Sequence, residues 1–469
     1  MICGMDQTHP TSETPYEFSG GYPTAATAKK AHEDAYLERA LVAYRFWYPT
    51  VSIEGIFNGN RELGFDDNKA MGIAATTPRQ VGFTLNSDTP YGAAALDLTE
   101  GPMVIELPPG AYIGLVDDHH HRWITDMGIP GPDQGAGGTY AILPPDHTGE
   151  VPADHHVSRS NSFKVLVAVR ALPVGGDLDA AKDALLRVKI YRLGTDKLLD
   201  VIDTSTKTVD STCLRWEDNL EFWRVLHGIL EEEPLVEEFR PMHGLLDGLG
   251  IGKGTPFAPT DRDAAALTKA ARIGRDQMLV TAFAGTRPDQ AAWTDRQWEW
   301  VGLVPDNADF ETPAGLDLEA RERWFAQAIV ASPAMFRRVE GSGSLYWLAT
   351  RDSTGTYLDG ANAYTLTIPL PVPGKLFWSV TIYDAQTRSQ VQTDGNKGAL
   401  RSLFELSSAL TSGNEITLHF GPTQPDDAAD NWLETVPGRG WFAYIRIYGP
   451  EAAAFDGSWR PGDFTPAKH

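Results

Sequence analysis

Cysteine is almost absent from this 469-residue chain, which contains only Cys3 and Cys213. One pair of cysteines cannot build the multiple disulfide bonds that hold small secreted domains together. Two cysteines are also too few for a cysteine-based metal site. We therefore expect neither a disulfide framework nor thiol redox chemistry.

Basic residues are scarce as well. The chain has 40 Lys and Arg against 63 Asp and Glu, which gives a formal net charge of -23. A field of this sign repels phosphate backbones and anionic lipid head groups. Nucleic acids and membrane surfaces are therefore not expected as partners.

Long apolar stretches are missing too. No run of about 18 apolar residues, the length that crosses a bilayer, occurs anywhere in the sequence. Residues 1–23 also lack the basic stretch and apolar core of a secretory signal. These absences lead us to expect a cytoplasmic protein.

The residues that are abundant favour a turn-rich β fold. Hydrophobic residues make up 42% of the chain, enough for more than one buried core. The 45 Gly and 32 Pro suit frequent turns, and 13 Trp, 15 Tyr and 19 Phe supply large apolar surfaces.

Helical spacing appears at the start and in the middle of the chain. Residues 24–48 predict a helix because Leu37, Leu41, Tyr44 and Tyr48 recur at helical intervals, with Pro49 as its end. Similar stripes lie between about residues 177 and 339. They comprise Leu220, Trp223, Leu226 and Leu230, and the stretches 260–284 and 317–331.

Strand-like runs occupy the two flanking regions. In the first half they are Met103–Leu107, Tyr112–Val116 and Phe163–Val169. In the second half, residues 376–383 and 441–448 alternate between an apolar and an amphipathic face. The apolar sets are Leu376, Trp378, Val380 and Ile382 in one strand and Trp441, Ala443, Ile445 and Ile447 in the other.

Together these patterns predict an α+β fold that is mainly β, with two jelly-roll or β-sandwich-like domains. We expect an N-terminal extension and helix over 1–59 and a first β-domain over 60–192. A helical connecting segment would follow over 193–340, and a second β-domain over 341–469.

Three sequence blocks resemble a known pair of families. They are 86-NSDTPYGAAALDLTEGPMVIELPPG-110, 357-YLDGANAYTLTIPLPVPGKLFWSVTIYDAQTRSQVQTD-394 and 430-DNWLETVPGRGWFAYIRIYGPEAAAFDGSWRPGD-463. The chain resembles the families of unknown function 1254 in its first half and 1214 in its second. The resemblance implies two jelly-roll-like domains, frequent assembly into oligomers and no established activity. The chain departs from the family pattern at 117-DDHHHRWITD-126, where relatives carry an aromatic residue and a Gln.

The histidine run within that departure suggests metal or acid–base chemistry. If residues 112–121 form one strand, His119 and His121 project from the same face, and Asp126 follows. Two imidazoles and a carboxylate suit a divalent Zn, Fe, Mn or Ni ion, so His119, His121 and Asp126 are the candidate ligands. The alternative is a solvated or hydrogen-bonded run at a strand end.

Two further sets complete the candidate site. The catalytic candidates are Asp118, His119, His120 and Asp88, and the substrate-binding candidates are Asn86, Tyr91, Trp123, Arg388, Arg446 and Tyr448. Asn86 and Asp88 either make an Asx-type turn or line a pocket. Arg446 either grips a carboxylate or stacks on an aromatic ring, or pairs with Asp384 or another acid as a structural contact.

These residues suggest an enzyme of hydrolase or lyase type that acts on a small organic molecule by Asp/His acid–base or metal-assisted chemistry. The alternative is a small-ligand-binding or self-assembling β-protein without turnover. In both cases we expect a homo-oligomer.

Overall fold

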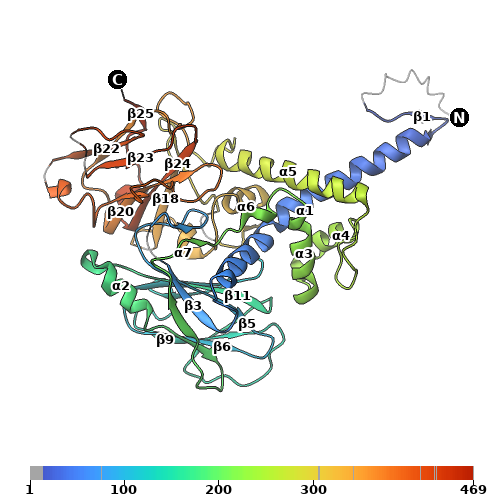
Figure 1. Ribbon diagram of the computed structural model, residues 1–469, viewed down its shortest axis with the longest axis horizontal. Helices are drawn as coiled ribbons and strands as arrows, with labels where there is room; N and C mark the ends of the chain where they lie inside the picture. Colours follow the sequence, from blue (N-terminus) through green and yellow to red (C-terminus); the bar gives the residue numbers. More distant parts are fainter. Residues whose placement is uncertain are drawn as a thin grey trace. The chain divides into compact units, whose positions relative to one another are not determined.

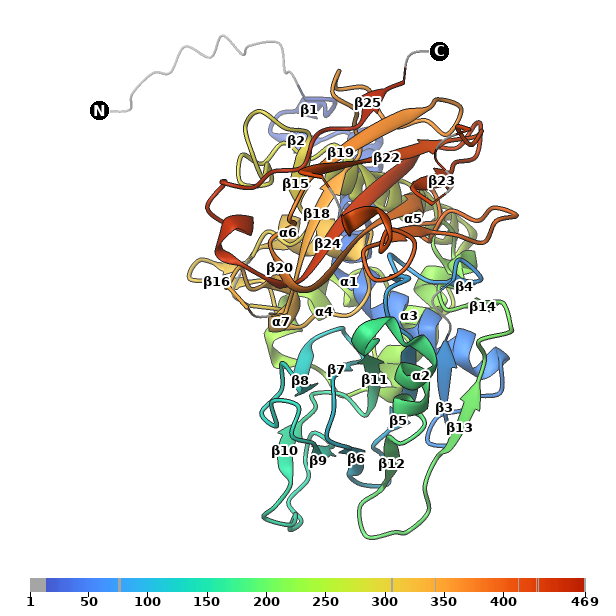
Figure 2. The same ribbon diagram turned by 90° about the vertical axis from the view of Figure 1, so that its left-hand side faces the viewer.

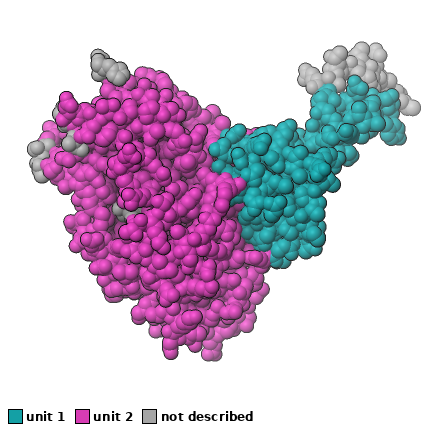
Figure 3. Space-filling model, viewed as in Figure 1, with its two compact units in different colours: residues 1–46, 216–231, 235–276 teal, residues 47–215, 232–234, 277–469 magenta. Residues whose placement is uncertain are grey.

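The structure is a computed structural model that describes residues 14–74, 77–304, 307–341, 343–411, 413–426, 428 and 430–467. These residues divide into two units, shown in teal and magenta in Figure 3. Unit 1 holds residues 14–46, 216–231 and 235–276, and unit 2 holds residues 47–215, 232–234 and 277–467. Cys3 lies outside the described residues.

Unit 1 is helical (Figure 1). It contains the first part of α1 (Ala25–Glu62), nearly all of α3 (Glu221–Glu232), α4 (Arg240–Asp247) and the first part of α5 (Asp261–Phe283), with the short strands β1 (Phe18–Ser19) and β2 (Tyr22–Pro23). Its interior is aromatic. The rings of Tyr44 and Phe222 lie 4.2 Å apart, and the Trp223 indole N–H donates to the Leu267 carbonyl at 2.8 Å. The predicted stripe is buried at Trp223, Leu226 and Leu230.

The prediction that Pro49 ends the first helix is wrong, because α1 continues to Glu62 with Pro49 inside it. Proline removes one backbone hydrogen bond from a helix interior and is destabilising there. The residues that follow include Val51, Ile53 and Phe57, which are all fully buried. Burial of this apolar stretch therefore offsets the missing hydrogen bond.

The first sandwich of unit 2 has a six-stranded and a four-stranded sheet (Figure 2, lower part). The larger sheet has the order β13 (Asp200–Asp203), β3 (Ala70–Ala74), β5 (Tyr91–Asp97), β11 (Lys164–Ala171), β7 (Tyr112–Asp118) and β8 (Trp123–Gly128). The smaller one has the order β10 (His156–Arg159), β9 (Gly138–Leu143), β6 (Met103–Leu107) and β12 (Lys189–Arg192). One core joins the two sheets, with Val167 and Val169 from the larger and Ile105 and Ile142 from the smaller. The helix α2 (Leu178–Leu185) adds Leu185 to this core.

The second sandwich is built in the same way (Figure 2, upper part). Its five-stranded sheet has the order β15 (Trp298–Trp300), β18 (Ser344–Ala349), β24 (Trp441–Pro450), β20 (Gly374–Asp384) and β21 (Ala399–Arg401). Its four-stranded sheet has the order β23 (Trp432–Glu434), β22 (Glu415–Gly421), β19 (Tyr364–Pro369) and β25 (Thr465–Pro466). The fold is therefore mixed and mainly β, as predicted, with two-sheet sandwiches, while a jelly-roll order remains a prediction.

Further short elements of unit 2 lie outside the four sandwich sheets. They are α6 (Leu318–Phe325), α7 (Pro333–Phe336), and the two-residue strand pairs β4 (Gln80–Val81) with β14 (Val209–Asp210) and β16 (Glu311–Thr312) with β17 (Gly315–Leu316). The predicted helix over 260–284 is present as α5, whereas the helix expected over 317–331 covers only α6. No helix among the described residues is both long enough and apolar enough to cross a bilayer.

The alternation predicted for the second β-region holds with one exception. Trp378, Val380 and Ile382 face the core together with the apolar set of β24. Leu376 does not join them and is 52% exposed. The pairing of β20 with β24 shifts register between Gly374 and Phe377, and this irregularity removes Leu376 from the core face.

This exception gives a matched pair of substitutions on one strand. Ile382→Ala removes a fully buried side chain and should lower the free energy of unfolding by about 3 kcal/mol. Leu376→Ala should change it by less than about 1 kcal/mol, because half of the side chain already contacts solvent. Urea denaturation of the two variants measures both values. An equal loss of unfolding free energy in both variants would contradict the conclusion that the register shift removes Leu376 from the core face.

Candidate functional site

A cavity of about 200 Å³ lies in unit 2, lined by residues of both sandwiches. Its walls come from the six-stranded sheet, from strands β18 and β24 of the five-stranded sheet, and from residues in the segments 80–91 and 324–335. The lining residues of the strands are mostly those that point away from the sandwich cores, such as Leu166 and Ala168 on β11. The cavity therefore lies between the outer faces of the two larger sheets.

The register of the six-stranded sheet places the residues of one wall. Arg170 on β11 pairs with Tyr91 on one side and with Ile113 on the other. Leu115 follows Ile113 by two residues on β7. It pairs with Ala168 of β11 on one side and with Asp126 of β8 on the other. Paired residues in an antiparallel sheet share a face, so Arg170 and Asp126 point into the same space.

Arg446 lies on the opposite wall, between Tyr444 and Tyr448 on β24. It is only 3% exposed, and its Nη2 donates to the Thr84 carbonyl at 2.8 Å. Its Nε and Nη1 have no hydrogen-bond partner among the described residues. The predicted pairing with Asp384 is wrong, because Asp384 accepts a hydrogen bond from Arg439 at 2.6 Å instead.

Asp88 lies behind the cavity wall and is fully buried. Its Oδ2 accepts hydrogen bonds from the Ser379 hydroxyl at 2.8 Å and from the Tyr448 hydroxyl at 3.0 Å. Its Oδ1 has no partner among the described residues. Burial raises the pKa of Asp88, while the positive charge of Arg446 opposes that rise.

Asn86 both forms an Asx turn and lines the cavity, the two roles that the sequence left open. Its Oδ1 accepts the backbone N–H groups of Asp88 at 2.8 Å and Thr89 at 3.1 Å, which makes an Asx turn. Its Nδ2 donates to the Tyr91 hydroxyl oxygen at 2.5 Å, and both residues line the cavity.

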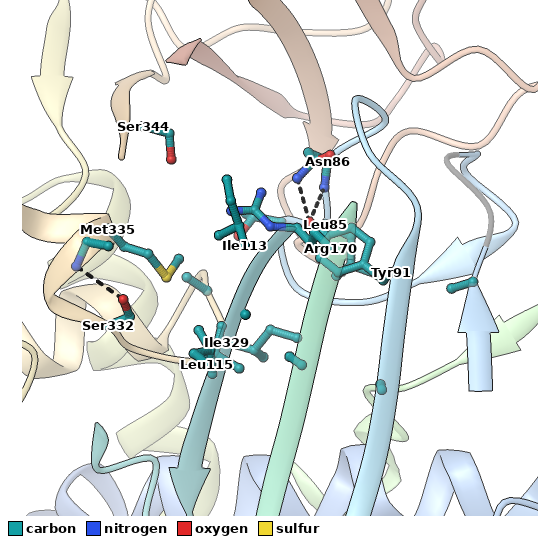
Figure 4. Close-up of a pocket in the computed structure, with 18 of the residues that line it drawn as sticks. Leu85, Asn86, Tyr91, Ile113, Leu115, Arg170, Ile329, Ser332, Met335 and Ser344 are labelled. Carbon is teal, nitrogen blue, oxygen red and sulfur yellow. Dashed lines mark hydrogen bonds between the residues drawn. The ribbon is translucent and has the colours of Figure 1, made fainter. Parts of the chain in front are cut away.

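Asp126 lines the other side of the cavity. The Ser332 hydroxyl donates to its Oδ1 at 2.6 Å. Burial raises the pKa of Asp126 to about 6, although the hydrogen bond from Ser332 acts against it. In Figure 4, Asn86, Arg170 and Tyr91 lie on one side, Ser332 and Met335 on the other, and Ile113, Leu115 and Ile329 between them.

The histidine run does not continue the strand, so the predicted alternation of His119 and His121 is wrong. Strand β7 ends at Asp118, and its pairing with β8 shifts register between Val116 and Asp117. His121 has a positive φ of 55°, as the turn between the two strands requires. The three rings are buried, and none of them lines the cavity.

His119 lies between two carboxylates. Its Nδ1 donates to Glu233 at 2.8 Å and its Nε2 donates to Glu54 at 3.1 Å, since carboxylates only accept. Burial alone would lower the pKa of His119, but Glu233 and Glu54 raise it to about 9. Conversely, the bond and charge of His119 outweigh burial and lower the pKa of Glu54 to about 2.

His120, His121 and Asp118 differ from His119 in their contacts. His120 shares a hydrogen bond with Thr50 at 2.9 Å. His121 stacks on Phe325 at 5.2 Å, and burial lowers its pKa to about 3. The Asp118 carboxylate accepts the backbone N–H groups of His120 and Arg122, and burial raises its pKa to about 7.

The predicted metal ligands do not form a metal site. No group of three or more His, Cys, Asp or Glu side chains within the described ranges could hold a metal ion. His119 is engaged by Glu233 and Glu54, whereas Asp126 is bound to Ser332. The residues present therefore do not fit the expected Zn, Fe, Mn or Ni ion.

Two predicted binding residues lie outside the cavity lining. Arg388 is fully buried, donates to the Gln386 carbonyl at 2.7 Å and lies 4.6 Å from the Phe83 ring centre. Trp123 is half-buried at the start of β8. The sequence reasoning missed Arg170, Ser332 and Thr84. The strand pattern of the sequence could have identified Arg170, because residues 166, 168 and 170 of β11 point to the same face of the sheet.

Comparisons with known proteins agree with the resemblance in both halves. Residues 70–192 match the family described as "Protein of unknown function (DUF1254)", and residues 343–452 match "Protein of unknown function (DUF1214)". The solved VPA0106 protein from Vibrio parahaemolyticus has 18% identity and a TM-score of 0.56 over 92% of this chain and 100% of its own. A putative uncharacterized protein from Burkholderia cenocepacia has 12% identity and a TM-score of 0.41 over 95% and 97%. No curated protein matches the chain.

The environment of His119 predicts a pH-dependent stability. Its pKa is raised from 6.5 to about 9 in the folded state, so its stabilising effect is complete below pH 6.5 and is lost as pH rises through 9. His119→Gln should therefore lower the free energy of unfolding by about 3 kcal/mol at pH 6 and by much less at pH 10. Urea denaturation at both pH values measures the difference.

The control for this measurement is His155→Gln, because His155 pairs with an Asp154 side chain that is 85% exposed. This variant should change stability by less than about 1 kcal/mol at either pH. A loss in His119→Gln that did not shrink at high pH would show that the imidazolium charge is not what stabilises the fold.

Proposed function

We propose that this chain, which resembles the 1254 family in its first half and the 1214 family in its second, binds a small organic anion in the cavity of unit 2. The proposal rests on Arg446, whose guanidinium is buried and has two donor groups without a partner among the described residues. A guanidinium stays charged in proteins, and a buried charge with unused donors is strongly unfavourable. A bound anion would supply the missing acceptors for its Nε and Nη1.

Arg170 adds a second positive charge to the same cavity. It comes from the other sandwich and lies 5.8 Å from the ring centre of Tyr91. The chain as a whole is strongly acidic, with a formal net charge of -23, and so repels anions. Two arginines in a low-dielectric cavity provide the local field that would overcome this repulsion.

The volume and lining of the cavity indicate the size and polarity of the rest of the ligand. Its volume of about 200 Å³ is below the roughly 300–1,000 Å³ of sites for drug-sized molecules. Ile113, Leu115, Leu166 and Ile329 make much of the lining apolar. These features favour a small carboxylate with an apolar chain or ring.

Acid–base turnover is the second candidate, and the contact between Tyr448 and Asp88 favours it. Tyr448 is one of the residues that line the cavity, and its hydroxyl donates to the buried Asp88 carboxylate. The phenol oxygen could take a proton from the carbon next to the ligand carboxylate while its own proton moves to Asp88, which leaves the electron pair of the broken C–H bond on the ligand as an enolate. The reverse transfer would return a proton to that carbon and restore Tyr448 and Asp88. Asp118, His119 and His120, also predicted as catalytic, do not line the cavity.

Binding is tested by calorimetry with hexanoate, benzoate and 3-phenylpropanoate and with the neutral amide of each acid. At least one acid should bind, and its amide should bind at least tenfold more weakly. Arg170→Met should weaken binding of that acid about tenfold to a hundredfold, as expected for a lost charged hydrogen bond. Arg446→Lys, which keeps the charge but loses the planar fork, should also weaken it.

The control is Arg351→Met, because Arg351 in unit 2 contacts Tyr357 and the Gly355 carbonyl outside the cavity. Its affinity for the acid should equal that of the unmodified protein. Equal affinities for acids and amides, or an unchanged affinity in Arg170→Met, would contradict the anion site.

Turnover is tested by proton NMR of the tightest-binding acid in D₂O. An acid–base enzyme should exchange the hydrogens next to the carboxylate for deuterium or convert the acid to a new species. Tyr448→Phe should slow this change by about 100-fold or more while the acid still binds. Tyr357→Phe, at a residue that is 47% exposed, should leave the rate unchanged. No change in the acid would favour binding without turnover.

A further inference from the structure

The cavity is polarised along the surface of one sheet. Arg170 pairs with Ile113, and Asp126 pairs with Leu115 two residues further along the same strand. Arg170 and Asp126 are thus separated by two strand spacings and two residues, which places their backbones about 12 Å apart. Ile113 and Leu115 are on β7, the strand between β11 and β8, and so lie between them.

The end near Arg170 offers hydrogen-bond donors. The Nε and Nη1 groups of Arg446 have no partner among the described residues. The Tyr91 oxygen already accepts the Asn86 side-chain N–H, so its own O–H remains available to donate. An anionic group is the natural occupant of this end.

The end near Asp126 offers acceptors instead. The Ser332 hydroxyl accepts the Ala334 backbone N–H at 3.1 Å and donates its single proton to Asp126. Ser332 therefore has no proton left for a ligand. Asp126 has further lone pairs after accepting that bond, because a carboxylate can accept about four hydrogen bonds.

The wall at this end is fixed in place. Val330 has a φ of 56°, which is strained for a β-branched residue. The next residue, Ala331, donates its backbone N–H to the buried Asp117 at 2.9 Å. The Ala331 bond anchors the backbone next to Ser332, and Ser332 lies beside Asp126 at this end of the cavity.

We propose that the ligand is a hydroxy- or amino-carboxylic acid, whose carboxylate meets Arg170 and Arg446 and whose distal hydroxyl or amino group donates to Asp126. Asp126 is then the residue that determines specificity. This inference rests on the proposed anion site and adds the second recognised group. It also requires an apolar spacer, which the side chains of Ile113 and Leu115 accommodate.

Matched probes test the proposal by calorimetry at pH 7.5. One pair is 3-phenylpropanoate and 3-(4-hydroxyphenyl)propanoate, and the other set is hexanoate, 6-hydroxyhexanoate and 6-aminohexanoate. In at least one set, a member with the distal donor should bind tenfold or more tighter than the plain acid. Asp126→Leu should abolish that preference while the plain acid still binds.

Ser332→Ala is the matched control, since it removes the hydrogen bond to Asp126 but keeps the carboxylate. It should retain the preference for the donor-bearing probe. If Asp126 only supports the wall, Asp126→Leu and Ser332→Ala would weaken all probes alike, and this result would overturn the inference.

The outcomes also separate the two proposals. If plain acids bind but the donor-bearing probes gain nothing, the anion site stands and the role of Asp126 is overturned. If no acid binds and the folded protein is otherwise intact, the anion site itself is overturned, and the inference that rests on it fails as well.

Discussion

The buried guanidinium of Arg446 constrains the structure around it, because every neighbouring segment has to accommodate a positive charge away from water. The Thr84 carbonyl accepts one of its hydrogen bonds, and the ring centres of Tyr444 and Tyr383 lie 5.0 and 5.5 Å from it. The Tyr383 hydroxyl shares its single proton between the Leu85 carbonyl at 2.9 Å and the Thr84 carbonyl at 3.3 Å. The segment that begins at Thr84 is therefore fixed by the same groups that surround the charge.

This fixed segment brings Asn86 to the cavity and Asp88 behind its wall. The Asx turn at Asn86 orients the chain, and Ser379 and Tyr448 hold the Asp88 carboxylate. Asp88 and Arg446 partly balance each other in charge, but two donor groups of Arg446 and one acceptor oxygen of Asp88 remain without a partner among the described residues. Incomplete compensation of this kind is unfavourable in a protein interior, which supports a role for the site beyond stability.

The Glu54, His119 and Glu233 group provides the contrast. Here a buried imidazolium has a carboxylate on each ring nitrogen, and Glu233 also accepts the backbone N–H groups of Phe163 at 2.5 Å and Lys164 at 3.0 Å. An imidazolium whose two ring nitrogens are both hydrogen-bonded in this way joins helix α1 to the turn after β7. The histidines were the most conspicuous feature of the sequence, yet their geometry is that of a structural contact.

Sequence patterns predicted what depends on local periodicity. The alternation of 441–448 placed Arg446 and Tyr448 on the face opposite the core, where the structure has them. The same reasoning failed where backbone geometry breaks the period, as at the register shift beside Asp117 and at Pro49. Periodicity also could not predict that Arg170 and Arg446 line the same cavity, because their proximity depends on how the two sandwiches, which are far apart in sequence, pack against each other.

The cavity itself follows from small residues in the middle of a sheet. On strands β5 and β11, Ala93 and Ala168 pair directly and both line the cavity, while the residues beside them are buried in the sandwich core. Alanine is a poor strand former, so its presence at both positions is not explained by strand propensity. A larger side chain at position 168, which pairs with Leu115 on the side of Asp126, would occupy the space between Arg170 and Asp126. Ala168 thus keeps open the apolar distance between the donor end and the acceptor end of the cavity, and Ala93 keeps open the space on the other side of β11.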